Sequence, residues 1–163
     1  MIPSAYKEGP YSGDPCRYAV DAAVGKVRWV AERYAGVVIG ADTVVVIDGE
    51  MLGKPASDED ARTMLGRLSA RTHTVYTGVC VINTALQQEK TLCEATDVTF
   101  RSLSNEEIVA YLETGEYRDK AGAYGIQGEG GGLVEGVVGE ITNVIGLPLS
   151  AVAAVLREMG VPV

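Results

Sequence analysis

Ile39-Gly40-Ala41-Asp42-Thr43-Val44-Val45-Val46 is an apolar, largely β-branched stretch that carries a single carboxylate near its middle. With the apolar residues on either side it predicts a buried strand over residues 37–47, interrupted by the polar pair Asp42-Thr43. A carboxylate in such a strand costs several kcal/mol unless it meets a cation, a metal or hydrogen-bond donors. Lys54, on the far side of the Asp48-Gly49 turn, is the nearest candidate partner. The alternative is that Asp42 only caps a turn.

Length and composition restrict the class of protein. The chain has 163 residues, which fits one domain, and 47% of them are hydrophobic, with no apolar run long enough to span a membrane. The formal charge of -8 argues against nucleic-acid binding, which requires a basic face. A phosphorylated small molecule can still bind where a few cations converge with a divalent metal. No signal peptide is visible at the start, so a cytoplasmic protein is expected.

The cysteines and the single histidine narrow the chemistry further. Cys16, Cys80 and Cys93 are an odd number with no close pair in the sequence, which predicts neither a disulfide framework nor a zinc site. A reducing cytoplasm is the simplest setting for them. His73 stands alone, so a Ser-His-Asp or Cys-His mechanism has only one candidate base and is discounted.

Helical and strand patterns alternate along the rest of the chain. Asp14-Pro15 begins a helix that is expected to end near Gly36, and the Ser104 capping box begins another that ends at Gly115. The other expected elements are a helix over 58–68, strands over 72–83 and 91–100, and a helix over 148–160. The two strands are expected to form a hairpin, which favours an α/β or α+β fold with a mixed sheet.

A glycine-rich segment carries polar groups in the second half of the chain. In Asp119-Lys120-Ala121-Gly122-Ala123-Tyr124-Gly125-Ile126-Gln127-Gly128 the glycines allow backbone to approach a ligand closely. Glu129-Gly130-Gly131-Gly132 then resembles a nucleotide loop, but it lacks the lysine and hydroxyl residue of a P-loop and the dinucleotide spacing. A flexible surface hairpin over 129–132 is therefore expected.

A series of short motifs extends over almost the whole chain. They are Gly40-Ala41-Asp42-Thr43-Val44-Val45, Gly53-Lys54-Pro55, Tyr76-Thr77-Gly78-Val79, Val98-Thr99-Phe100, the segment from Asp119 to Gly128, and Val144-Ile145-Gly146-Leu147-Pro148-Leu149. In this order they resemble the Maf family of nucleoside triphosphate pyrophosphatases. The resemblance implies a fold of the inosine-triphosphate-pyrophosphatase type, with two lobes around a cleft.

The resemblance also implies a reaction and a set of site residues. The reaction is hydrolysis of a nucleoside triphosphate to the monophosphate and pyrophosphate, with a divalent metal, Mg²⁺ or Mn²⁺. Asp42 matches the proton acceptor that activates water, and Lys54 and Lys26 match lysines that face the phosphates. Asp42 and Glu8 match positions near the metal. By composition alone, Lys26 would be an ordinary solvated lysine on the flank of its helix.

Two positions imply a substrate within this family. The branch that resembles dTTP/UTP pyrophosphatases has threonine after the catalytic aspartate and glutamine in the Tyr-Gly-Ile-Gln segment, as Thr43 and Gln127 are here. A branch that acts on 7-methyl-GTP has glutamine and glutamate at these places. An amide offers both a donor and an acceptor, as the edge of uracil or thymine requires. The expected substrates are dTTP, UTP and modified uridine triphosphates.

One part of the family pattern has no counterpart in this sequence. Family members begin with a strand and a Ser-x-Ser-Pro-Arg-Arg loop, whereas this chain starts roughly 25 residues into the pattern. We therefore expect residues 1–163 to form one Maf-like domain that is truncated at its N-terminus and lacks the first strand and helix. The alternative function is a non-catalytic protein that binds nucleotide or only folds and associates. A homodimer is compatible with either function.

Overall fold

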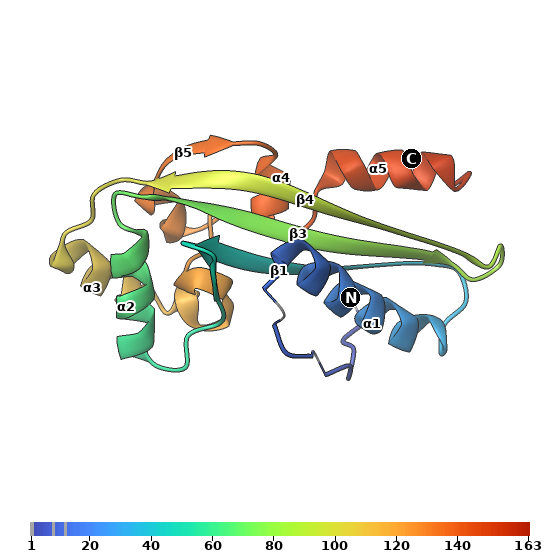
Figure 1. The fold of residues 1–163 in the computed structure, drawn as a ribbon, viewed down its shortest axis with the longest axis horizontal. Coiled ribbons are helices and arrows are strands. Elements are labelled where there is room, and N and C mark those ends of the chain that lie inside the picture. Colours follow the sequence, from blue (N-terminus) through green and yellow to red (C-terminus); the bar gives the residue numbers. More distant parts are fainter. Residues whose placement is uncertain (1, 8, 12) are drawn as a thin grey trace.

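The computed structural model describes residues 2–7, 9–11 and 13–163 (Figure 1). Its helices, strands and 3-10 turns are, in chain order, α1 (Pro15–Ala31), β1 (Val37–Ile47), β2 (Glu50–Leu52), α2 (Asp58–Leu68), β3 (Thr72–Asn83), β4 (Gln88–Phe100), α3 (Asn105–Thr114), η1 (Glu116–Asp119), η2 (Ala121–Ala123), η3 (Glu129–Leu133), β5 (Val134–Val138), α4 (Ile141–Ile145) and α5 (Leu149–Glu158). The predicted combination of helices with a sheet in an α+β arrangement is confirmed.

The described residues form one five-stranded sheet with the order β2-β1-β3-β4-β5, and its neighbouring strands run antiparallel. In the register, Asp42 of β1 lies opposite Gly78 of β3, and Gly78 lies opposite Cys93 of β4. Cross-strand neighbours point to the same face of a sheet, so these three residues form one row. The predicted hairpin of residues 72–83 and 91–100 is confirmed, with β4 starting slightly earlier, at Gln88.

Helices cover both faces of the long strands. Figure 1 shows α1 and α5 on opposite sides of β3 and β4. Under α1, Ala23 and Val27 pack against Cys80 of β3. On the other face, Val79 and Val81 pack against residues of α5. A larger cluster lies where α2 and α3 meet the end of the sheet, and it includes Leu65, Phe100 and Tyr117.

Capping residues account for the positions of the helix ends. The Asp14 side chain accepts a hydrogen bond from the Arg17 N–H, and the Ser104–Glu107 capping box forms both of its bonds. The first helix is shorter than predicted, because it ends at Ala31 rather than near Gly36. Gly36 has φ +122° and donates its N–H to the Thr84 hydroxyl, so it belongs to the connection that leads into β1.

The glycine-rich segment 129–132 differs from its prediction. Instead of a flexible surface hairpin, Glu129–Leu133 forms a 3-10 helix in which Gly130 is buried. The Glu116 carboxylate accepts hydrogen bonds from the backbone N–H groups of Glu129 and Gly130. These contacts hold the segment against the end of α3, and no local sequence signal indicates a partner 13 or 14 positions earlier.

The prediction that the cysteines form no disulfide is also wrong. Cys16, in the first turn of α1, is bonded to Cys93 of β4, although 77 positions separate them in the sequence. α1 crosses β3 so closely that a Cβ on Gly78 would lie 2.3 Å from the Ala19 carbonyl carbon. This close crossing brings Cys16 within reach of the row that contains Cys93. Cys80 is free and buried, and burial raises the pKa of its thiol to about 12.

Candidate functional site

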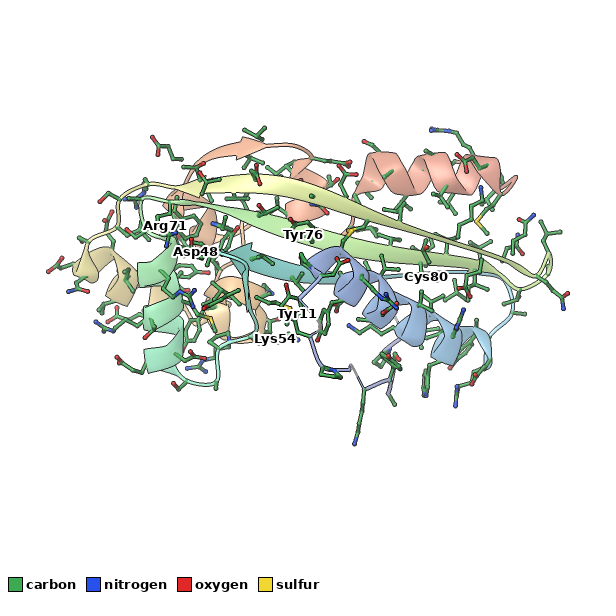
Figure 2. The ribbon with its side chains drawn as sticks, in the orientation of Figure 1. Tyr11, Asp48, Lys54, Arg71, Tyr76 and Cys80 are labelled. Carbon is green, nitrogen blue, oxygen red and sulfur yellow. A yellow bond between two sulfur atoms is a disulfide. The ribbon has the colours of Figure 1, made fainter. Side chains whose placement is uncertain are left out.

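A cavity of about 230 Å³ lies at the exposed edge of β1. Its lining includes Asp42, Thr43 and Lys54, so these three predicted site residues lie together. Within the described part of the chain, β2 pairs with β1 only along Val45–Ile47, which leaves the edge at Asp42 and Thr43 open. Asp42 and Thr43 are neighbours in the strand, so their side chains point to opposite faces of the sheet. Both can still line one cavity, because no strand covers the edge between these two faces. Lys54 follows β2 on the segment that leads to α2 (Figure 2).

The carboxylate of Asp42 has a cation at hydrogen-bond distance. Lys26 Nζ of α1 donates to Asp42 Oδ1 at 2.5 Å, and the two side chains are 29% and 14% exposed. The nearest predicted partner, Lys54, lines the same cavity, but the ion pair is with Lys26. Asp42 therefore lies in mid-strand rather than capping a turn, and Lys26 is not an ordinary solvated lysine. Gly40 helps the approach, because a Cβ there would lie 2.5 Å from a Val27 methyl group.

Thr43 belongs to a hydrogen-bond network beneath the cavity. Its hydroxyl lies 2.9 Å from the Thr77 hydroxyl, and Thr77 donates to the Asn143 carbonyl at 3.0 Å. The Asn143 side chain is fully buried and donates to the Val75 carbonyl and the Thr96 hydroxyl. This network fastens α4 to β3 and β4. Neither Thr77 nor Asn143 was among the predicted site residues, and the only sequence signal for Asn143 is an amide within an apolar segment.

A second cavity, of about 460 Å³, adjoins the first. Gln127 and Glu116 line it, and it shares Asp119, Lys120 and Ile126 with the cavity of Asp42. Gln127 therefore lies in the same cleft as Asp42, Thr43 and Lys54 but in a separate part of it, whereas Lys26 lines a different cavity. The cleft can hold a ligand that extends from the β1 edge to the glycine-rich segment.

Asp119 and Lys120 stand between the two cavities and add charge to the cleft. Lys120 Nζ donates to Asp119 Oδ1 at 2.8 Å. This hydrogen bond lowers the pKa of the Asp119 carboxyl, and the charge of Lys54 acts in the same direction. The described lining of the cleft thus combines the ammonium groups of Lys54 and Lys120 with the carboxylates of Asp42, Asp119 and Glu116, an arrangement suited to an anionic ligand with a metal counterion. Both residues belong to the glycine-rich motif of residues 119–128, but neither was a predicted site residue.

Aromatic residues form the wall behind this charged region. Tyr124 lines both cavities, and its hydroxyl lies 2.8 Å from His73 Nε2. Phe100 packs edge-on against both rings. Burial lowers the pKa of His73 to about 4, although the charge of Asp97 opposes the shift, and burial raises the pKa of Tyr124. His73 is therefore a neutral core residue, consistent with discounting it as a catalytic base.

The described residues contain no group of three or more His, Cys, Asp or Glu side chains that could hold a metal ion. The predicted metal residue Glu8 lies outside the described residues. None of the described helices is long and apolar enough to cross a membrane.

Comparison with known proteins relates this chain to a family. The family model described as Maf-like protein matches residues 1–159. A dTTP/UTP pyrophosphatase of Thermococcus onnurineus is 49% identical over 160 residues, covering 98% of this chain and 85% of the relative. The dTTP/UTP pyrophosphatase of Symbiobacterium thermophilum is 44% identical over 163 residues, with 99% and 83% covered. That of Myxococcus xanthus is 48% identical over 161 residues, with 95% and 79% covered.

Proposed function

Because this chain belongs to the Maf-like protein family, we propose that it is a nucleoside triphosphate pyrophosphatase that hydrolyses dTTP and UTP. The products are the nucleoside monophosphate and pyrophosphate. The observation that carries the proposal is the ion pair between Lys26 and Asp42, whose carboxylate lines a cavity together with Lys54 and Lys120. Relatives named dTTP/UTP pyrophosphatase, at 44–49% identity over nearly the whole chain, support the choice of nucleotide.

Asp42 is the general base of the proposed reaction. A carboxylate that lines the cavity can take a proton from water as the water attacks phosphorus. Lys26 fixes the orientation of this carboxylate and stabilises its charged form, because the ammonium group lies 2.5 Å from Oδ1. Since Lys26 stands on α1 and Asp42 on β1, the geometry of the base depends on how the helix sits on the sheet.

Lys54 and Lys120 bind the phosphates in this proposal. Both line the smaller cavity from outside β1, because Lys54 follows β2 and Lys120 lies between η1 and η2. Ammonium groups stabilise the negative charge that develops on phosphate oxygens in the transition state. Lys120 also lines the larger cavity, which suits a ligand that extends through both.

A divalent metal, Mg²⁺ or Mn²⁺, fits the carboxylates of the cleft. Mg²⁺ usually takes one or two carboxylates from a protein and completes its coordination with substrate phosphates and water. Asp42 and Asp119 both line the smaller cavity and would supply these ligands, and Glu8 stays a sequence-based prediction. When bound, the metal would neutralise phosphate charge and orient the triphosphate.

The nucleobase lies in the larger cavity in this proposal. Gln127 lines that cavity and presents an amide, which can both donate to and accept from the edge of uracil or thymine. Thr43 lies in the smaller cavity and contributes to specificity through its hydroxyl, which is held near Thr77. Modified uridine triphosphates with the same hydrogen-bonding edge belong to the proposed substrates.

The remaining expectations are part of the same proposal. Residues 1–163 act as one Maf-like domain in the cytoplasm, without nucleic acid or membrane partners. The proposed assembly is a homodimer, and analytical ultracentrifugation of the purified protein would measure its mass. A monomer at micromolar concentration would contradict the dimer without affecting the proposed reaction.

A panel of nucleoside triphosphates tests the proposal. Monophosphate and pyrophosphate are measured after incubation with dTTP, UTP, CTP, ATP and GTP in Mg²⁺ and in Mn²⁺. We expect equal amounts of the two products and the highest kcat/KM with dTTP and UTP. Thermal stabilisation by UTP without any product would overturn the proposal and favour a non-catalytic nucleotide-binding protein.

A further inference from the structure

We propose that Glu116 is a positioning residue for nucleobase selection, because its carboxylate fixes the backbone of the loop that carries Gln127. This inference rests on the proposed function, in which Gln127 contacts the base. Glu116 lies directly after α3, where Gly115 ends the helix with φ +74°. It lines the same cavity as Gln127, although the two are 11 positions apart in the sequence.

Both carboxylate oxygens of Glu116 are used by the loop. Oε1 accepts the N–H of Glu129 at 3.2 Å, and Oε2 accepts the N–H of Gly130 at 3.4 Å. Hydrogen bonds to a charged acceptor are stronger than those between neutral groups. Two such bonds to adjacent backbone groups fix the orientation of the loop as well as its distance from α3.

Close packing supports the same function for Glu116. A Cβ on Gly128 would lie 2.4 Å from each carboxylate oxygen of Glu116, so the loop passes directly over this side chain. A Cβ on Gly130 would lie 2.5 Å from the Gly125 carbonyl oxygen. Glycine at these two places permits the loop to close on itself and on the carboxylate.

A second anchor holds the other side of Gln127. The Tyr111 hydroxyl of α3 accepts the N–H of Gly125 at 3.3 Å. The three residues from Ile126 to Gly128 therefore lie between a bond to Tyr111 on one side and the bonds to Glu116 on the other. Gln127, in the middle, is exposed and lines the cavity. Holding its backbone reduces the positions that its amide can occupy, which is the requirement for selecting a base edge.

The substitution Glu116→Gln tests this function with little change of volume. An amide can accept one backbone N–H but meets the other with its own N–H₂ group, so one anchor is lost. We expect the ratio of kcat/KM for UTP over CTP to fall about tenfold, mainly through a higher KM for UTP. Glu113→Gln is the matched control, because Glu113 is an exposed residue of α3 and makes the same change of charge.

A double variant separates positioning from direct contact with the base. If Glu116 acts through Gln127, Glu116→Gln changes the UTP/CTP ratio little once Gln127→Ala is present. An equal fall of the ratio in both backgrounds would overturn the inference. Unchanged selectivity in Glu116→Gln with wild-type turnover would also overturn it, whereas absence of turnover in the wild type would overturn the proposed function instead.

Amide hydrogen exchange tests the loop without any turnover. Exchange at the Glu129 and Gly130 amides should be at least about tenfold faster in Glu116→Gln than in Glu113→Gln, at equal global stability. Equal exchange rates at these two amides would show that the carboxylate does not hold the loop. If Glu116→Gln does not fold, Glu116→Asp serves as a second variant. Its side chain is one methylene shorter, so the Glu129 and Gly130 amides should again exchange faster than in Glu113→Gln.

Discussion

A single methyl group added at Gly78 should disturb two links between α1 and the sheet, the Lys26–Asp42 ion pair and the Cys16–Cys93 disulfide. Gly78 lies between Asp42 and Cys93 in one row across β1, β3 and β4. A Cβ there would lie 2.3 Å from the Ala19 carbonyl carbon and 2.3 Å from the Val20 nitrogen. Both atoms are backbone, so no side-chain rotation can relieve the contact in Gly78→Ala.

The size of the effect follows from these distances. Non-bonded carbon atoms prefer about 3.5–4.0 Å, so α1 must move away from β3 by roughly 1 Å. Overpacking of this kind costs about 1–3 kcal/mol of unfolding free energy. The displacement also separates Lys26 from Asp42, and a misplacement of about 1 Å near a reacting group can lower a rate about a hundredfold.

The assay compares Gly78→Ala with a matched substitution. Gly136→Ala is the control, since Gly136 also lies in a strand but has no atom within 4 Å of its Cβ position. Urea unfolding and kcat/KM for UTP are measured for both variants and for the wild type. We expect losses of stability and activity in Gly78→Ala only. Equal values for the two variants would refute the claim that α1 touches the sheet at Gly78.

Three further predictions concern other parts of the molecule. A reductant should lower the unfolding free energy of the wild type by up to about 4 kcal/mol, since the Cys16–Cys93 disulfide closes a long loop. The unfolding free energy of the Cys16→Ser/Cys93→Ser variant should not change with reductant. An equal decrease in the variant and the wild type would contradict the disulfide. His73 has a pKa of about 4 when folded and about 6.5 when unfolded, so the unfolded chain binds the proton first as pH falls. Stability should therefore be fully present above pH 6.5 and fall by about 3 kcal/mol towards pH 4, a slope that His73→Gln should lack in parallel unfolding curves. Lys54→Ala should lower kcat/KM for UTP about a hundredfold. Lys90→Ala, in β4 where Lys90 pairs with Glu158, should leave kcat/KM unchanged. Similar kcat/KM values for the two variants would show that Lys54 does not belong to the site.

Local signals in the sequence were sufficient for most of the fold. The Ser104 capping box and Gly115 located α3, because capping depends on residues a few positions apart. β-branched alternation located β1 and β3, and the motif order identified the family, which the match over residues 1–159 confirms. The grouping of Asp42 with Lys54 followed from the short turn between β1 and β2.

Contacts between distant parts of the chain could not be predicted in this way. The disulfide depends on α1 crossing β3 at Gly78, and sequence separation gives no measure of that approach. The expectation that Lys54 is the nearest partner of Asp42 was wrong for a similar reason. Lys26 reaches Asp42 because of where α1 lies on the sheet. Glu116 was missed because the groups that donate hydrogen bonds to its carboxylate are backbone N–H groups, which have no signature in the sequence.

The most direct test of the central claim is the single-turnover rate of Asp42→Asn with saturating UTP and Mg²⁺. The amide keeps the shape of the carboxylate but cannot take a proton from water. With Asp42 as the base beside Lys26, the rate should fall at least about a hundredfold while UTP still raises the melting temperature of the variant. A rate equal to that of the wild type, with UTP bound, would contradict the account.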